Sequence, residues 1–226
     1  MKIPLFDIDG TLFKTANPVH KNAFAYAFNK VYGVDAKQTE IRPEGMVDNQ
    51  IIIEVLKLHG LSETEIKKKI KQATKTMTRY FEEHENEVNP EILPGVMSLL
   101  EKLEHEKIPM GVLTGNVEEI AWIKLEGAGI RDFFDFGAFG DKAFKRVELV
   151  EQARQNAQKS LGKTFKTDDF IIVGDTPRDI QCAKDADIEA IAVSTGIYPF
   201  EELVDEKPDL AVHSLEEKRV FDFIKN

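Results

Sequence analysis

The sequence predicts an α/β protein in which helices cover both faces of a parallel β-sheet and a helical segment is inserted after the first strand. One observation is that short apolar runs alternate with helical patterns from about residue 95 onward. Such alternation is typical of parallel sheets that are built by right-handed crossovers. A second observation is that the stretch from about residue 15 to residue 88 has helical patterns and no convincing strand. We therefore expect one sheet whose sequence is interrupted by an insertion.

Six apolar runs are expected to form the strands. The first covers residues 3–6, and the others cover residues 110–113, 136–139, 170–173, 190–193 and 210–212. Helical patterns at about residues 95–106, 117–127, 145–161 and 178–186 separate or follow the later runs. Ligand sites in sheets of this kind lie at the carboxyl ends of the strands. The residues directly after each run are therefore the first candidates for chemistry.

The insertion has helical patterns at about residues 18–32, 47–58 and 62–85, and its charge runs are expected to be solvated helix faces. We expect an α/β core from residues 1–14 and 95–226, a helical cap from residues 15–88, and a linker at residues 89–94. Connections near residues 15–18 and 88–94 would allow the cap to act as a lid over the sheet. His20, just after the first connection, is expected to be a surface or hinge residue, with lining of the entrance as the alternative.

Composition limits the partners and the compartment. The formal net charge is -10 and there is no basic stretch, which argues against nucleic acid as the main partner. The chain has one cysteine, which excludes an intrachain disulfide and fits a reducing compartment. It has no signal peptide pattern and no apolar segment long enough to span a membrane. We expect a soluble, cytoplasmic protein without a membrane partner, and a choice between monomer and homodimer stays open.

The segment Asp7-Ile8-Asp9-Gly10-Thr11 directly follows the first predicted strand. Carboxylates at positions i and i+2 of an extended chain point to the same side, and Gly10 lets the backbone turn away. Such a pair can hold a hard divalent cation, or it can provide a nucleophile and a proton donor. An Asp-Gly turn after an edge strand is the simpler alternative.

A second polar segment, Thr114-Gly115-Asn116, follows the second predicted strand and precedes a helix. A strand–turn–helix junction presents backbone N–H groups that favour a phosphate, and the Thr114 hydroxyl can add a donor. A strand-end threonine followed by Asn116 as a helix cap explains the same residues. Taken alone, this pattern favours the capping explanation.

Three cations lie between the third predicted strand and the next helix, namely Lys142, Lys145 and Arg146. A phosphoryl site needs a cation to offset the charge on the transferring group. On its own the cluster indicates a charged surface, and the sequence leaves open which of the three residues faces a site.

The segment Gly174-Asp175-Thr176-Pro177-Arg178-Asp179 follows the fourth predicted strand. Pro177 suits the first turn of a helix. Asp175 and Asp179 can approach each other there, as a metal ligand and a supporting carboxylate. Helix capping explains Asp179 but leaves Asp175, at the strand end, without a role.

The four segments in this order resemble the haloacid dehalogenase-like hydrolase superfamily, and the resemblance covers essentially the whole chain. Within it, the chain is similar to the helical-cap branch that includes phosphoglycolate phosphatases and β-phosphoglucomutases. The resemblance implies a Rossmann-like α/β core with an inserted α-helical cap. It also implies that the site binds a small phosphorylated metabolite.

The resemblance further implies a role for each matching residue. Asp7 would be the nucleophile that forms an aspartyl-phosphate, and Asp9 would be the general acid and base, protonated near neutral pH for its first step. Mg²⁺ would be held by Asp7, the Asp9 backbone carbonyl and Asp175, with Asp179 supporting them. Arg146 would supply the positive charge, although the family commonly has a lysine there. The substrate would contact Thr114, Gly115 and Asn116, and Arg42 in the predicted cap loop could bind a substrate carboxylate.

The expected function is a Mg²⁺-dependent phosphatase that hydrolyses a small phosphomonoester, with phosphoglycolate as the leading substrate. Asp9 favours phosphoester over haloacid chemistry, because a halide leaving group needs no proton. A phosphomutase of the β-phosphoglucomutase type is the first alternative. A non-catalytic binding or regulatory protein on the same scaffold is the second, and the intact Asp7, Asp9 and Asp175 argue against it.

Overall fold

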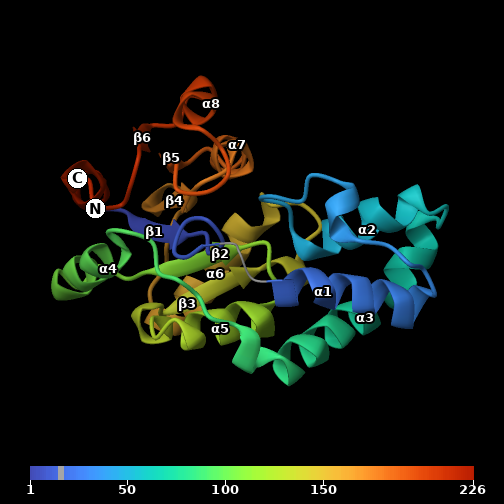
Figure 1. The fold of residues 1–226 in the computed structure, drawn as a ribbon. Coiled ribbons are helices and arrows are strands. Elements are labelled where there is room, and N and C mark those ends of the chain that lie inside the picture. Colours follow the sequence, from blue (N-terminus) through green and yellow to red (C-terminus); the bar gives the residue numbers. More distant parts are fainter. Residues whose placement is uncertain (15–17) are drawn as a thin grey trace.

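The computed structural model describes residues 1–14 and 18–226 and confirms the predicted α/β fold (Figure 1). The described strands form one six-stranded sheet in the order β3-β2-β1-β4-β5-β6, and every neighbouring pair is parallel. The strands are β1 (Ile3–Phe6), β2 (Gly111–Thr114), β3 (Phe136–Phe139), β4 (Phe170–Gly174), β5 (Glu189–Val193) and β6 (Leu210–Val212). Their carboxyl ends lie at one edge of the sheet, and the central strands β2, β1 and β4 are adjacent there.

Helices cover both faces of the sheet because successive strand residues point to opposite sides. On one face, Phe6 and Val173 pack with side chains of α4 (Val96–His105), α5 (Glu118–Gly127) and α9 (Lys218–Lys225). On the other face, Leu5 and Ile172 pack with α6 (Glu148–Leu161) and α7 (Pro177–Asp185). The apolar strand residues are therefore buried on both faces, as parallel sheets require.

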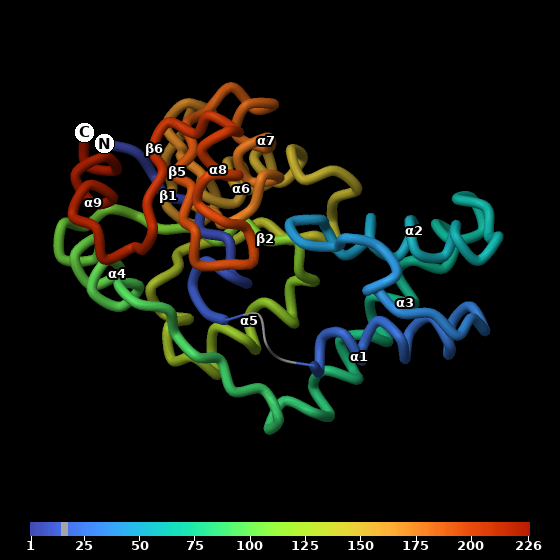
Figure 2. The backbone as a smooth tube through the Cα atoms, turned by 45° about the horizontal axis from the view of Figure 1, so that its top comes forward, coloured from blue at the N-terminus to red at the C-terminus, as the bar shows by residue number. Residues whose placement is uncertain are grey.

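The helices α1 (Pro18–Ala27), α2 (Asp48–Leu58) and α3 (Glu63–Glu83), here called the insertion helices, lie together to one side of the sheet (Figures 1 and 2). They share an apolar cluster that includes Phe24, Ile52 and Phe81 and that extends to Ile120 of α5. The lysines of the predicted charge run, residues 67–69, are exposed as expected. The division into core, cap and linker remains a prediction, and most of the first connection lies outside the described residues.

Most predicted elements agree with the structure to within a few residues, and the differences have physical reasons. The predicted helix at 18–32 is α1 followed by a π-helical segment, Phe28–Tyr32, which ends at Gly33 with a positive φ of 70°. Two further helices, α8 (Phe200–Asp205) and α9, were not predicted. They have 6 and 8 residues, which is too short for a clear helical period in the sequence.

The return from the insertion helices runs beside the segment that follows β1. The Lys14 N–H donates to the Glu91 carbonyl at 3.0 Å, and the Leu93 N–H donates to the Leu12 carbonyl at 3.0 Å. The residues that follow β1 and the residues that return to the sheet therefore lie side by side. Within the described residues, no helix is both long and apolar enough to cross a membrane.

Candidate active site

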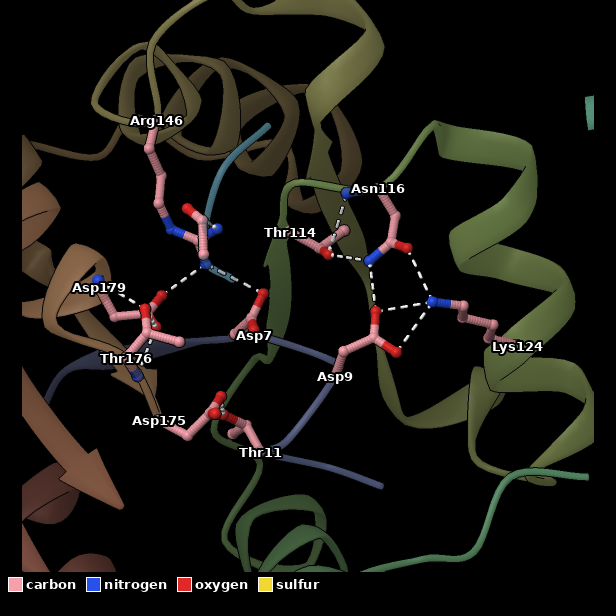
Figure 3. A network of polar contacts seen from close by, with 11 residues as sticks. Asp7, Asp9, Thr11, Thr114, Asn116, Lys124, Arg146, Asp175, Thr176 and Asp179 are labelled. Atoms are coloured by element: carbon pink, nitrogen blue, oxygen red, sulfur yellow. Dashed lines mark hydrogen bonds and ion pairs between the residues drawn. The ribbon is translucent and has the colours of Figure 1, made fainter. Parts of the chain in front are cut away.

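A cavity of about 490 Å³ lies where the carboxyl ends of β1, β2 and β4 face the insertion helices. Residues from both parts of the chain line it. From the sheet side these include Asp7, Asp9, Thr114, Asn116, Lys124, Arg146 and Asp175, and from the insertion side His20, Lys21, Gly45 and Asp48. The polar side chains that the sequence singled out after three strands therefore meet in one place (Figure 3).

Three buried carboxylates form a cluster that could hold a metal ion. Asp7 follows β1, Asp175 follows β4, and Asp179 lies in the first turn of α7. One carboxylate oxygen from each lies within 4.8 Å of the others. These are hard oxygen donors of the kind that Mg²⁺ prefers. We call this set the carboxylate cluster.

Neighbouring side chains hold the carboxylate cluster in place. The Thr11 hydroxyl donates to Asp175 Oδ1 at 2.9 Å. Thr176 is the N-cap of α7, and its hydroxyl and N–H both donate to Asp179 Oδ2, at 2.7 and 3.0 Å. With Pro177 at the start of the helix, these bonds form a capping box. Asp179 therefore caps the helix with one oxygen and presents the other to the site.

The charges of the cluster are only partly compensated. Burial raises the pKa of Asp7 from 3.8 to about 7, with Asp179 and Asp9 adding to the rise and Arg146 opposing it. Burial and the neighbouring Asp7 and Asp179 likewise raise the pKa of Asp175. A divalent cation would relieve this repulsion, so the donor set and its electrostatics fit Mg²⁺.

Arg146 is the cation that the structure brings to the cluster. It is 7% exposed and lies just before α6. Its Nη2 donates to Asp7 Oδ1 at 3.0 Å and to Asp179 Oδ1 at 2.5 Å, and its Nη1 donates to the Gly45 carbonyl at 3.0 Å. Lys142 and Lys145 are exposed, and Lys142 pairs with Glu118. The choice among three cations that the sequence left open is thus decided by burial and contact.

Thr114 is the last residue of β2 and Asn116 follows it, and both line the cavity. The Thr114 hydroxyl accepts from Asn116 Nδ2 at 2.6 Å and from the Asn116 N–H at 3.3 Å. Since a hydroxyl also has one proton to donate, Thr114 can still bond a phosphoryl oxygen. Gly115 is required for close packing, because a Cβ there would lie 2.0 Å from the Met46 carbonyl oxygen.

Asp9 turns away from the carboxylate cluster (Figure 3). Its Oδ2 accepts from Lys124 Nζ at 2.6 Å and from Asn116 Nδ2 at 2.9 Å, and its Oδ1 accepts from Lys124 Nζ at 2.9 Å. Its side chain is not part of the cluster, and the predicted metal contact through its backbone carbonyl remains a prediction. Burial alone would raise the pKa of Asp9, but the Lys124 ammonium and the hydrogen bonds from Lys124 and Asn116 contribute to lowering it below its ordinary value. Asp9 is therefore held in its ionised form in the protein without substrate, and its protonation beside a bound phosphate remains a prediction.

Lys124 was missed in the sequence. It is 3% exposed and lies on the buried face of α5, which also carries Ile120, Ala121 and Leu125. A lysine at such a position is seldom buried without a carboxylate partner. The available signal was its position on the apolar face of the helix, four residues after Ile120 and three after Ala121.

The insertion helices contribute two further polar residues. His20 of α1 lines the cavity. The structure therefore supports the alternative that His20 lines the entrance over a surface or hinge position. Its Nε2 lies 3.1 Å from Asp48 Oδ2, and its Nδ1 lies 3.4 Å from Lys124 Nζ. Asp48 Oδ2 also accepts from the Val117 N–H at 2.9 Å, at the start of α5. Asp48 therefore joins the insertion helices to a helix of the sheet side.

The loop before α2 is docked on the sheet side of the cavity. Arg146 donates to the Gly45 carbonyl, and Arg178 of α7 donates to the Glu44 carbonyl. Gly45 has a φ of +73°, and a Cβ there would lie 2.4 Å from Thr176 Oγ1. Arg42, which the sequence assigned to a substrate carboxylate, is exposed and is not among the residues that line the cavity. Its predicted role has no support from this arrangement.

Comparison with known proteins gives a consistent result. The family model described as haloacid dehalogenase-like hydrolase matches residues 4–193. PpaX of Caldanaerobacter subterraneus subsp. tengcongensis, provisionally named a pyrophosphatase, is 26% identical over 221 residues, which cover 93% of this chain and 90% of that protein. Phosphoglycolate phosphatase of Agrobacterium fabrum is 29% identical over 143 residues, which cover 60% of this chain and 56% of that protein.

Solved structures with the same fold cover nearly the whole chain. A hydrolase from Pseudomonas syringae superposes with a TM-score of 0.71 at 18% identity, covering 99% of both chains. β-Phosphoglucomutase from Clostridium difficile superposes with a TM-score of 0.68 at 22% identity, covering 100% of this chain and 96% of that chain. At these identities the likeness concerns the fold alone.

Proposed function

The chain belongs to the haloacid dehalogenase-like hydrolase family and is a phosphatase, and from this premise we propose that it hydrolyses a small phosphomonoester with Mg²⁺ through an Asp7 phosphoenzyme. The observation that carries the proposal is the meeting of Asp7 with Asp175, Asp179 and Arg146 in one buried site. A nucleophilic carboxylate, a metal-binding set and a phosphate-binding cation are the parts that phosphoryl transfer needs. The non-catalytic alternative has no comparable support.

In the first step, an Asp7 oxygen attacks phosphorus and the bond to the leaving oxygen breaks. Asp9 gives its proton to that oxygen, and in the second step Asp9 takes a proton from the water that hydrolyses the aspartyl-phosphate. Substrate binding adds negative charge beside Asp9, which favours the protonated form that the first step requires. Arg146 and the Thr114 hydroxyl would bind the phosphoryl oxygens, and the Gly115 and Asn116 turn would shape the pocket around them.

Mg²⁺ held by Asp7, Asp175 and Asp179 would offset the charge of the phosphate and of the carboxylates during the transfer. Without that offset, a dianionic phosphate would approach three carboxylates and one guanidinium. The raised pKa values of Asp7 and Asp175 support this need for a cation.

For the substrate, we propose a phosphate ester whose leaving group carries a second anion, as phosphoglycolate does. The cavity wall includes the cations Lys14, Lys21 and Lys124 beside His20. Lys14 pairs with Glu91 and Lys124 pairs with Asp9, so a carboxylate on the leaving group would be attracted chiefly to Lys21. Phosphoglycolate phosphatases among the relatives support the same class. Location in the cytoplasm remains a prediction from the sequence, and the choice between monomer and homodimer stays open.

The test is phosphate release from a panel of phosphomonoesters, with MgCl₂ and with EDTA. The panel contains phosphoglycolate, sugar phosphates, nucleotides and inorganic pyrophosphate. We expect Mg²⁺-dependent release that is greatest for a small substrate with a second anionic group. Labile phosphate trapped on the protein without release from any member would instead support the phosphomutase. If no phosphate is released and none is trapped on the protein in MgCl₂, the proposed function is contradicted.

A further inference from the structure

We infer that Lys124 is a positioning residue for Asp9, and that it links the orientation of the Asp9 carboxylate to the docked insertion helices through His20. The inference rests on the proposed function, because it assumes that Asp9 handles the leaving-group proton. It assigns a role to a side chain that does not belong to the carboxylate cluster. Four contacts made by the Lys124 ammonium carry the argument.

The contacts of Lys124 fix Asp9 from one side. Its Nζ lies 2.9 Å from Asp9 Oδ1 and 2.6 Å from Asp9 Oδ2, so it contacts both carboxylate oxygens. The same Nζ lies 2.8 Å from Asn116 Oδ1, and Asn116 Nδ2 donates to Asp9 Oδ2 at 2.9 Å. Lys124, Asn116 and Asp9 therefore form a closed ring of hydrogen bonds. Such a ring restricts the side-chain torsions of Asp9 far more than a single contact would.

The burial of Lys124 argues against an incidental surface pair. Its side chain is 4% exposed, whereas the side chain of Asp9 is 26% exposed and reaches the cavity. An ammonium is costly to bury, and it is retained only with close compensation. Replacing a buried ion pair by apolar residues is often neutral or stabilising, so stability alone does not explain such a pair. The arrangement therefore favours a role in holding Asp9 over a role in stability.

His20 extends this ring to the insertion helices. An ammonium can only donate, so His20 Nδ1 accepts from Lys124 at 3.4 Å and His20 Nε2 carries the proton donated to Asp48. Asp48 is in turn anchored to the Val117 N–H of α5. The chain of contacts runs Asp48–His20–Lys124–Asp9. Docking of the insertion helices thus supplies one of the groups that orient Lys124.

A positioning role predicts a dependence on the leaving group. An alkoxide must be protonated as it departs, whereas p-nitrophenolate departs readily without a proton. The parameter kcat/KM covers the steps up to departure of the leaving group. Loss of Asp9 alignment should therefore lower kcat/KM for an alkyl phosphate and spare p-nitrophenyl phosphate. A loss of general folding or of metal binding would lower both.

The experiment compares kcat/KM of wild type, Lys124→Met, Lys124→Gln and Asp9→Asn on phosphoglycolate and on p-nitrophenyl phosphate in MgCl₂. We expect Lys124→Met to lose about 10²-fold on phosphoglycolate and no more than about threefold on p-nitrophenyl phosphate, as the usual size of general acid catalysis suggests. Lys124→Gln, which keeps one donor toward Asp9, should lose less. Lys225→Met, which removes an exposed pair with Glu106, is the matched control and should equal wild type.

The double variant Asp9→Asn/Lys124→Met separates positioning from direct substrate binding. If Lys124 acts through Asp9, the double variant should be no slower on phosphoglycolate than Asp9→Asn alone. Multiplied losses, or equal losses of Lys124→Met on both substrates, would overturn the inference. His20→Leu leaves Lys124 and Asp9 in place, and it should show the same substrate pattern with a smaller loss. An effect of His20→Leu on both substrates would overturn the link to the insertion helices.

Failure of the Lys124 inference can be distinguished from failure of the proposed function. If wild type releases no phosphate from either substrate, the proposed function fails before Lys124 is tested. If wild type is active and Lys124→Met retains full kcat/KM on both substrates, only the role of Lys124 is refuted. Thermal melts of each variant identify unfolding, and Lys124→Gln replaces Lys124→Met if the latter is unfolded at the assay temperature.

Discussion

Arg146 and Asp7 are 139 residues apart in the chain and form a buried ion pair, with Arg146 Nη2 lying 3.0 Å from Asp7 Oδ1. The same guanidinium also bonds Asp179 and the Gly45 carbonyl. One side chain therefore contacts the proposed nucleophile, the carboxylate cluster and the loop that precedes α2. We therefore expect the chemistry of the site to depend on docking of this loop.

Asp7→Asn should abolish turnover and leave the fold intact. The substitution is nearly isosteric, but an amide cannot form the acyl-phosphate. We expect kcat to fall by about 10³-fold or more, with an unchanged circular dichroism spectrum and no phosphate trapped on the protein. Asp132→Asn, an exposed aspartate, is the control. Phosphatase activity near the wild-type level in Asp7→Asn would rule out Asp7 as the nucleophile.

Without a divalent cation, ionisation of Asp7 should lower the stability of the fold. Burial raises the pKa of Asp7 from 3.8 to about 7, so the folded state binds this proton more tightly than the unfolded state does. Its contribution to the free energy of unfolding therefore decreases as the pH rises from about 4 to about 7. We compare the Tm of Asp7→Asn with that of wild type in EDTA at about pH 5 and about pH 8. The variant should gain stability relative to wild type at the higher pH, by about 1 kcal/mol or more. Thermal melts showing the same difference at both pH values would contradict this.

Asp175→Asn should remove most of the stabilisation that Mg²⁺ provides. Asp175 offers one of the three oxygens of the carboxylate cluster, and Thr11 can still bond an amide oxygen at that position. Because a ligand that binds only the folded state stabilises it, MgCl₂ should raise the Tm of wild type and leave that of the variant nearly unchanged. Asp132→Asn again serves as the control. A wild-type Mg²⁺ response in Asp175→Asn would place the ion elsewhere.

Arg146→Lys should slow catalysis although it keeps the charge. A lysine cannot bond Asp7, Asp179 and the Gly45 carbonyl together, because it lacks the planar fork of the guanidinium. We expect kcat/KM to fall by about 10²-fold, similar to the loss of one preorganised donor. Arg154→Lys on α6 replaces the guanidinium in a partly exposed pair with Glu151 and should have little effect. Comparable kinetics of the two variants would show that Arg146 only supports the fold.

Gly45→Ala should weaken docking of the loop before α2. Its φ is +73°, and the added Cβ would lie 2.4 Å from Thr176 Oγ1. Gly33→Ala is a matched control, because Gly33 has a φ of +70° and no atom within 4 Å of the added Cβ. Both variants should lose about 1 kcal/mol of stability, but only Gly45→Ala should raise KM, by about tenfold if docking contributes about 1.4 kcal/mol to substrate binding. Steady-state kinetics and thermal melts measure the two effects, and an equal KM in both variants would contradict the prediction.

Much of the fold and part of the site could be predicted from local patterns. The apolar runs 3–6 and 170–173 are short, bounded and followed by carboxylates, so both the strands and Asp7 and Asp175 were recognisable. Helix α9 was not recognised because 8 residues give too few turns for a clear pattern. Lys124 was not recognised because its signal is a single charge on an apolar helix face, which has meaning only when the partner is known.

The sequence by itself determined the alternation of strands and helices, the place of the insertion and the polar residues at each strand end, because these depend on local periodicity and turn chemistry. Only the tertiary structure decided that Arg146, rather than Lys142 or Lys145, reaches Asp7. It also decided that Asp9 faces Lys124 and that His20 lines the cavity. Contacts of this kind join residues more than 100 positions apart. They depend on strand order and helix packing, and a pattern read along the chain carries no information about either.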